Sequence, residues 1–173
     1  MNIQDRFKKI TTFIFDIDGV LTDGSVLLLD NGHQARSMNI KDGYALQLAV
    51  RKGYRLAVIS GADMPPALER LKKLGISEVH FSVTDKKKYI EDFILNHKLN
   101  AEEILFMGDD MPDLPAFSVV GISACPADAV NEVRQACRFV SAYNGGKGCV
   151  REVLEIVLKL NDHWGHESGI VSR

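Results

Sequence analysis

Two groups of aspartates each follow a short apolar run. The runs are residues 12–15 and 104–107, and the aspartates that follow them are Asp16, Asp18, Asp109, Asp110 and Asp113. Two unit charges roughly 4 Å apart repel by about 1 kcal/mol in water and by about 4 kcal/mol at an effective dielectric near 20. A divalent cation removes that cost. Because no His or Cys converges on these acids, oxygen ligands favour a hard ion, and Mg²⁺ fits best.

A carboxylate beside a divalent ion can attack phosphorus when cationic groups neutralise the phosphoryl oxygens. Asp16 is the candidate nucleophile, and Asp18 can protonate the leaving alkoxide and later deprotonate the attacking water. We expect the phosphoryl oxygens to meet three further groups, which are Ser60, the amide of Gly61, and Lys86. Taken alone, Ser60-Gly61 is typical of a strand-ending turn, and Lys86 is typical of a solvated helix face.

These residues can meet only if the strands before them run side by side. Apolar segments alternate with helical periodicity along the chain. The strands expected are residues 12–15, 54–59, 78–81, 104–107, 119–122 and 139–140. Helices are expected to end near Gly53, Gly75 and Phe117 and to cover residues 86–97 and 150–160. The alternation predicts an α/β fold, a Rossmann-like three-layer domain with a parallel sheet and helices on both faces, whose strand ends share one ligand-binding edge.

One segment departs from this alternation. Residues 24–40 carry two extended stretches around Asp30-Asn31-Gly32, which predicts a β-hairpin. No linker divides residues 1–173, so we expect a single domain. The polar tail, residues 161–173, is of a kind that usually frays unless something holds it, and the sequence leaves its order open.

Composition excludes several function classes. The formal charge of −2 gives no reason to expect nucleic acid or an anionic membrane as partner, and a small molecule is the expected ligand. The three cysteines show no CxxC spacing, so reduced thiols are expected. No apolar run resembles a signal peptide or a membrane span, so we expect a cytoplasmic protein.

The motifs together resemble a known superfamily. Asp16-Ile17-Asp18-Gly19-Val20-Leu21-Thr22-Asp23-Gly24, Ile59-Ser60-Gly61, Thr84-Asp85-Lys86 and Gly108-Asp109-Asp110-Met111-Pro112-Asp113 look like motifs one to four of the haloacid dehalogenase superfamily, in order. The first motif and the segment 145–152 further resemble the capless branch of 3-deoxy-D-manno-octulosonate 8-phosphate phosphatases and related nine-carbon sugar acid phosphatases. The resemblance covers residues 10 to 160.

That resemblance implies a Mg²⁺-dependent hydrolase acting on a phosphorylated sugar acid, as in lipopolysaccharide biosynthesis. The ion would be held by Asp16, the carbonyl of Asp18 and Asp109, with Asp110 or Asp113 nearby as a further ligand or a support. Capless members are tetramers, so the hairpin would assemble a homotetramer and cover the active site. The loop at Gly145 and the tail would then reach a neighbouring subunit's site.

The resemblance also bears on the substrate. It places Lys41 and Asp42 near the substrate, together with Thr22 and Gly61, although Lys41-Asp42-Gly43 reads locally as a helix cap. After the motif-two Ser-Gly pair this chain has Ala62. In the family that it resembles, the octulosonate phosphatases share an Arg at this position, and a nonulosonate type has Glu. Arg70 and Lys73, one helical turn apart, are candidates for contact with a sugar carboxylate.

Several alternatives stay open at this point. The substrate could be a nonulosonate 9-phosphate, and the aspartyl phosphate could be passed to a second hydroxyl, as in a phosphomutase. A non-catalytic regulatory domain of the same fold is a third alternative, against which the intact Asp16 and Asp18 argue. Asp110 could equally be a helix N-cap.

Overall fold

The sheet predicted from the sequence is present in the computed structural model, which describes residues 2–171. Its six strands are all parallel and lie in the order β5-β4-β1-β6-β7-β8. Their bounds are β1 Thr12–Phe15, β4 Arg55–Ile59, β5 Glu78–His80, β6 Ile104–Met107, β7 Ile122–Cys125 and β8 Phe139–Val140. The Rossmann-like prediction is confirmed, with β1 between β4 and β6.

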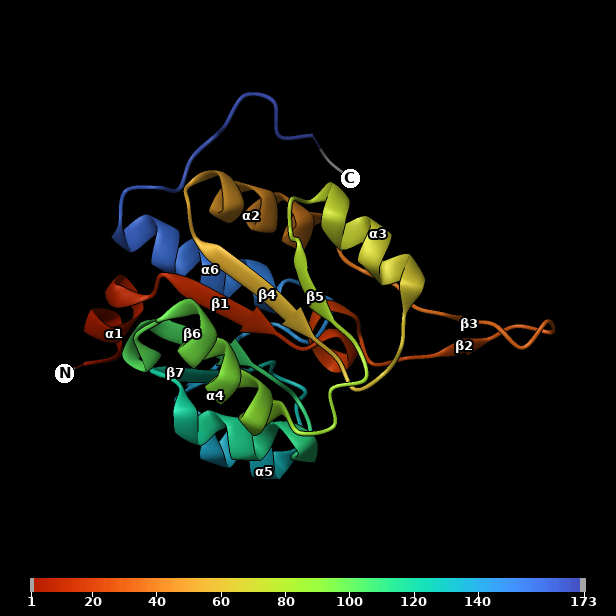
Figure 1. Cartoon of the computed structure of the whole chain (residues 1–173). Helices are drawn as coiled ribbons and strands as arrows, with labels where there is room; N and C mark the ends of the chain where they lie inside the picture. Colours follow the sequence, from red (N-terminus) through yellow and green to blue (C-terminus); the bar gives the residue numbers. More distant parts are fainter. Residues whose placement is uncertain (1, 172–173) are drawn as a thin grey trace.

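Helices cover both faces of this sheet (Figure 1). They are α1 Ile3–Lys9, α2 Ile40–Arg51, α3 Pro65–Lys73, α4 Lys86–His97, α5 Asn131–Ala136 and α6 Cys149–Leu160, with 3₁₀ segments η2 Ala101–Glu103 and η3 Met111–Val119. Phe13 and Phe15 pack in one core with α2 and α6, while Ile14 packs in the other with α4. Because successive side chains of β1 enter opposite cores, the strand is apolar throughout and fully buried.

The parallel strands aim their carboxyl ends at one edge of the sheet. The arrows of β1 and β4 in Figure 1 point toward the side from which the β-hairpin projects. Polar residues that follow these strands are therefore delivered to a common place, as parallel sheets require.

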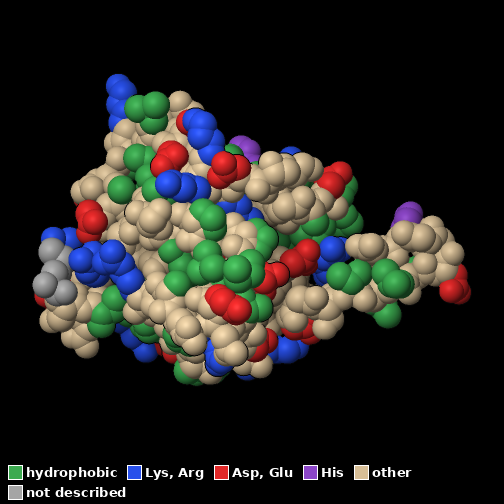
Figure 2. Space-filling view, turned by 90° about the horizontal axis from the view of Figure 1, so that it is seen from below, with side chains coloured by type: hydrophobic (Ala, Val, Ile, Leu, Met, Phe, Trp, Pro, Cys, Tyr) green, Lys and Arg blue, Asp and Glu red, His purple; other side chains and the backbone are tan. Residues whose placement is uncertain are grey.

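The hairpin is formed by β2 (Leu27–Leu28) and β3 (Gln34–Ala35), which pair antiparallel. Gly32 adopts φ +78° and its N–H donates to the carbonyl of Leu29 at 2.9 Å, so the turn relies on a residue that tolerates the left-handed region. The hairpin predicted for residues 24–40 is confirmed. In Figures 1 and 2 it extends well away from the body.

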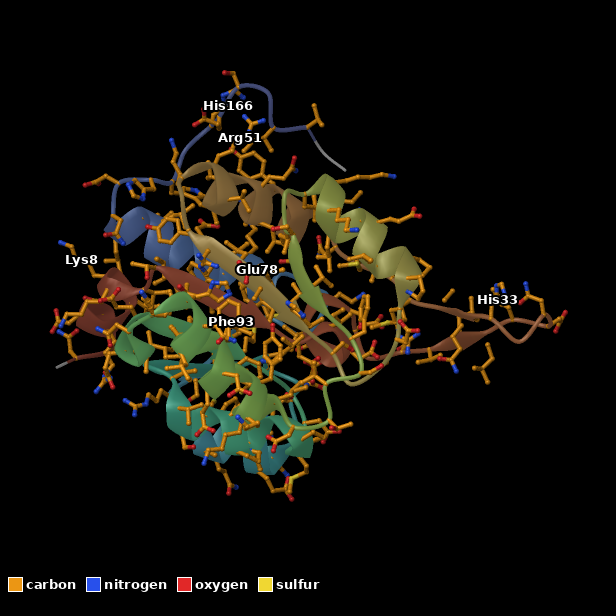
Figure 3. All side chains as sticks on the ribbon, in the orientation of Figure 1. Lys8, His33, Arg51, Glu78, Phe93 and His166 are labelled. Atoms are coloured by element: carbon orange, nitrogen blue, oxygen red, sulfur yellow. The ribbon has the colours of Figure 1, made fainter. Side chains whose placement is uncertain are left out.

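The polar tail is held against helix α2, at least as far as residue 171. Tyr44 donates its hydroxyl hydrogen to the carbonyl of Gly165 at 2.7 Å, and Arg51 donates to the carbonyls of Ser168 and Gly169. Figure 3 shows Arg51 beside the segment that carries His166. The order of the tail, which the sequence left open, is thus given by donors on α2 that the tail's composition does not reveal. Residues 172–173 lie outside the described range.

Two further details differ from the sequence-based expectations. The strand expected at residues 119–122 begins at Ile122 and runs to Cys125, because η3 continues to Val119. Helix α1 was not predicted; its Asn2 forms a capping box with Asp5, a signal that the short segment did contain. None of the helices within residues 2–171 could span a lipid bilayer.

Candidate active site

Lys86 joins two carboxylates that come from different strand ends. Its Nζ lies 2.7 Å from Oδ2 of Asp16, which follows β1, and 2.6 Å from Oδ1 of Asp113, which follows β6. Lys86 is the first residue of α4 and is 6% exposed, whereas Lys87 and Lys88 after it face solvent more openly. Of the three consecutive lysines, the one at the start of α4 is therefore a buried cation.

Asp109 completes the cluster. One carboxylate oxygen from each of Asp16, Asp109 and Asp113 lies within 4.8 Å of the other two. The close approach depends on Gly19, which has φ +81°: a Cβ at this position would lie 1.9 Å from Oδ2 of Asp109. Only glycine satisfies both the backbone angle and the contact.

The charges of this cluster are not balanced by the protein alone. Burial raises the pKa of Asp16 to about 6, although Lys86 opposes the shift, and nearby Asp113 raises it further. Burial also raises the pKa of Asp109 to about 7, with Asp16 and Asp113 adding repulsion. For Lys86, burial alone would lower the pKa, but Asp16 and Asp113 together raise it. Three oxygen donors with a surplus of negative charge fit a hard divalent cation.

Asp18 lies nearer to solvent than Asp16. Its Oδ1 accepts a hydrogen bond from Nε of Arg36 at 2.7 Å, and the Thr22 hydroxyl lies 3.4 Å from the same atom. The Asp18 side chain is 34% exposed, against 10% for Asp16. A carboxylate so placed can exchange protons with a bound molecule and with water.

A cavity of about 500 Å³ opens over these groups. Ser60 and Gly61, which follow β4, line it together with Ala62, and the amide of Ala62 donates to Oγ of Ser60 at 3.1 Å. Asp16, Asp18, Lys86 and the aspartates after β6 line the same cavity. The structure therefore brings together all the residues predicted to do chemistry.

Asp110 lines the cavity but stands apart from the three-carboxylate cluster. Its Oδ1 accepts from the amide of Met111 at 2.7 Å, and it forms a capping box with Asp113 at the start of η3. Asp113 in turn accepts from the amides of Asp109 and Asp110. Of the two readings left open for Asp110, the geometry gives the N-cap directly, while Asp113 is the acid that shares the cluster.

Four residues predicted to bind substrate lie outside that cavity. Thr22 is buried and ties its own loop through the amides of Gly19 and Gly24. Asp42 is buried against α6, where Oδ1 accepts from the amide of Arg151 at 2.8 Å, and burial raises its pKa to about 6. Lys41 lines a separate hollow along α6, and Arg70 lies on α3. Contact between substrate and these four residues stays a prediction.

The sequence did not indicate Arg36. It lies beyond β3, and no spacing in the hairpin distinguishes it from an ordinary exposed arginine. Only the folding of the hairpin toward the first motif brings its guanidinium to Asp18. The Gly145 loop also packs on that motif: the amide of Gly146 donates to the carbonyl of Val20 at 2.9 Å.

The chain is similar to known hydrolases in its sequence. A family model described as haloacid dehalogenase-like hydrolase matches residues 73–154. A 3-deoxy-D-manno-octulosonate 8-phosphate phosphatase from Haemophilus influenzae is 34% identical over 157 residues, which cover 91% of this chain and 87% of that protein.

Solved structures agree with this similarity. The phosphatase of the same description from Moraxella catarrhalis, in complex with magnesium ion, phosphate ion and a KDO molecule, has a TM-score of 0.89 at 30% identity and covers 93% of each chain. The Yersinia pestis enzyme of that description gives a TM-score of 0.90 at 28% identity, covering 93% of this chain and 87% of that one.

Substitution of Lys86 tests the charge balance. The folded-state pKa values of Asp16 and Asp109 exceed the unfolded value of 3.8, so the folded protein binds more protons and loses stability as pH rises from about 4 to about 7. In chelator, Lys86→Met should lower the free energy of unfolding by about 3–5 kcal/mol at pH 8, as for a broken buried pair, and by less at pH 5. Urea unfolding measures both values.

Lys87→Met is the matched control. Lys87 is the next lysine in the chain, and its side chain pairs with Glu91 in contact with solvent. It should change stability by less than about 1 kcal/mol at either pH. An equal loss at pH 5 and pH 8 in Lys86→Met would contradict the charge-balance account.

Proposed function

This chain belongs to the haloacid dehalogenase-like hydrolases and is a phosphomonoesterase, and we propose that it hydrolyses a phosphorylated sugar acid through an aspartyl phosphate on Asp16. The observation that carries the proposal is the cluster of Asp16, Asp109 and Asp113, in which buried Lys86 pairs with Asp16 and Asp113. Three carboxylates beside one lysine leave a surplus of negative charge, which does not stabilise the fold but can hold a cation. Phosphoryl transfer needs such a cation beside the phosphoryl oxygens.

In the first step a carboxylate oxygen of Asp16 forms a bond to phosphorus as the bond to the sugar oxygen breaks. Asp18 gives its proton to the leaving oxygen. In the second step water attacks phosphorus, Asp18 takes the proton, and the bond between Asp16 and phosphorus breaks to release phosphate. The exposure of Asp18 at the cavity agrees with a role in both steps.

The remaining groups hold the phosphoryl oxygens. Lys86 offsets their negative charge, while the Ser60 hydroxyl and the Gly61 amide donate hydrogen bonds to them. Asp16, Asp109 and the carbonyl of Asp18 would hold a Mg²⁺, with Asp113 in support. When bound, the ion supplies positive charge that makes the phosphorus accessible to an anionic nucleophile.

The substrate that we propose is 3-deoxy-D-manno-octulosonate 8-phosphate, a precursor in lipopolysaccharide synthesis. The support is the similarity to the Haemophilus and Moraxella phosphatases over nearly the whole chain. A nonulosonate 9-phosphate is the second candidate. Ala62, which lines the cavity, is neither the Arg of the octulosonate type nor the Glu of the nonulosonate type, so this position favours neither substrate.

Replacing the nucleophile tests the mechanism. Asp16→Asn should lower phosphate release from octulosonate 8-phosphate in Mg²⁺ by more than about 10³-fold, because an amide oxygen cannot form the covalent intermediate. Malachite green assay of released phosphate measures it, and Asp110→Asn, which can keep the N-cap, is the control. A fully active Asp16→Asn enzyme would reject the mechanism.

We further propose that the hairpin assembles a homotetramer and covers the active site. Leu27 and Leu28 are 63% and 73% exposed at its strands, and Figure 2 shows apolar side chains on the projecting arm. Exposed apolar area of this kind costs about 25 cal/mol per Å² relative to its burial, so a partner surface is favoured.

Charges on the hairpin should prevent this assembly. The double variant Leu27→Asp, Leu28→Asp should sediment as a smaller species than the wild type at micromolar concentration, because two carboxylates cannot be buried in an apolar contact. Analytical ultracentrifugation measures the mass. Leu95→Asp, at an equally exposed leucine on α4, should leave it unchanged. A monomeric wild type, or an unaltered mass in the hairpin variant, would refute the proposal.

A further inference from the structure

The active-site cavity is strongly acidic on its protein side. Five carboxylates line it, while Lys86 is the only lysine or arginine that does so among residues 2–171. Lys86 already pairs with Asp16 and Asp113. A phosphorylated sugar acid carries a second anion besides its phosphate, and that carboxylate needs a cation elsewhere.

Arg36 is a cation at the edge of this cavity. Its Nε lies 2.7 Å from Oδ1 of Asp18, and its Nη2 donates to Oε1 of Gln34 at 3.4 Å. The Arg36 side chain is only 14% exposed although it belongs to the projecting hairpin. A guanidinium has five N–H donors in a plane, so these two contacts do not exhaust it.

A second hollow begins at the same arginine. It has a volume of about 660 Å³, and it lies between the hairpin and the start of α3. Arg36 lines it together with Asp63 and the apolar side chains of Leu29, Met38 and Met64. The Asp18–Arg36 pair therefore stands where the phosphate end of the site meets a hollow with room for the body of a sugar.

The basic residues Lys41 and Arg70 lie elsewhere. Lys41 lines a hollow on the side of α6 with Lys147 and Arg151. Arg70 lies on α3 and lines neither the active-site cavity nor the hollow beside the hairpin. Within the chain's own described residues, Arg36 is thus the cation best placed to meet a substrate that has its phosphate at Asp16.

We propose that Arg36 is a specificity-determining residue, whose guanidinium binds the carboxylate of an acidic sugar phosphate and so selects it over neutral sugar phosphates. The inference rests on the proposed function. Substrate binding then exchanges one carboxylate partner of Arg36 for another, or adds a second, without leaving the arginine unpaired. A neutral sugar phosphate has no carboxylate to pair with Arg36, so the arginine does not strengthen its binding.

The test compares the two substrate classes. We expect Arg36→Gln to lower the ratio of kcat/KM for octulosonate 8-phosphate to kcat/KM for mannose 6-phosphate by about 10- to 100-fold, as for a lost charge-assisted hydrogen bond. Most of the loss should fall on the KM for the acidic substrate. Arg36→Lys should recover part of the ratio, because the charge returns without the planar donors.

Arg6→Gln is the matched control. Arg6 of α1 pairs at 2.9 Å with Glu102 of η2, and these two elements precede β1 and β6. The pair is therefore at the amino ends of the strands, opposite the active site, and its loss should leave the ratio unchanged. Circular dichroism and ultracentrifugation of Arg36→Gln check that fold and assembly persist.

The outcomes are distinguishable. A wild type that prefers acidic substrates, with an unchanged ratio in Arg36→Gln, would overturn the role of Arg36 and keep the proposed function. An equal loss on both substrates would also overturn it, because Arg36 would then act through Asp18 alone. A wild type that shows no preference for acidic sugar phosphates would overturn the proposed function itself.

Discussion

The structure depends on one electrostatic constraint, the closeness of three carboxylates, two of them buried and paired with a single buried lysine. Asp16, Asp109 and Lys86 come from three separate strand-to-helix connections, and only a parallel sheet with β1 between β4 and β6 brings them to one edge. Gly19 leaves the room that Asp109 occupies. Burial raises the pKa values of Asp16 and Asp109, which means that the charged forms of both carboxylates are disfavoured at this place in the fold.

Sequence reasoning predicted the sheet and this cluster because both follow from local signals. Strands such as β1 are continuous apolar runs, and the residue after each run is placed by the topology. It did not predict Arg36, the packing of the tail, or the first residue of β7. Arg36 reaches Asp18 only through the path of the hairpin, and Tyr44 and Arg51 hold the tail by contacts across more than a hundred residues.

The residues proposed for catalysis and the residue proposed for selection belong to different elements of the fold. The groups assigned to phosphoryl transfer follow strands of the buried sheet, whereas Arg36 belongs to a hairpin with exposed apolar side chains. Ala62, which lines the active-site cavity, contributes no charge to it. A hairpin that both covers the site and supplies a cation would let assembly, substrate fit and selectivity depend on one short segment.

Direct titration with Mg²⁺ tests the central claim that the carboxylate cluster is a divalent-ion site. Calorimetry at neutral pH should show saturable binding to the wild type, binding weakened by more than about 10-fold in Asp109→Asn, and near wild-type binding in Asp110→Asn. Each protein that binds should also unfold at higher temperature with the ion present. Equal affinity in the wild type and Asp109→Asn, or no binding to the wild type, would contradict the account.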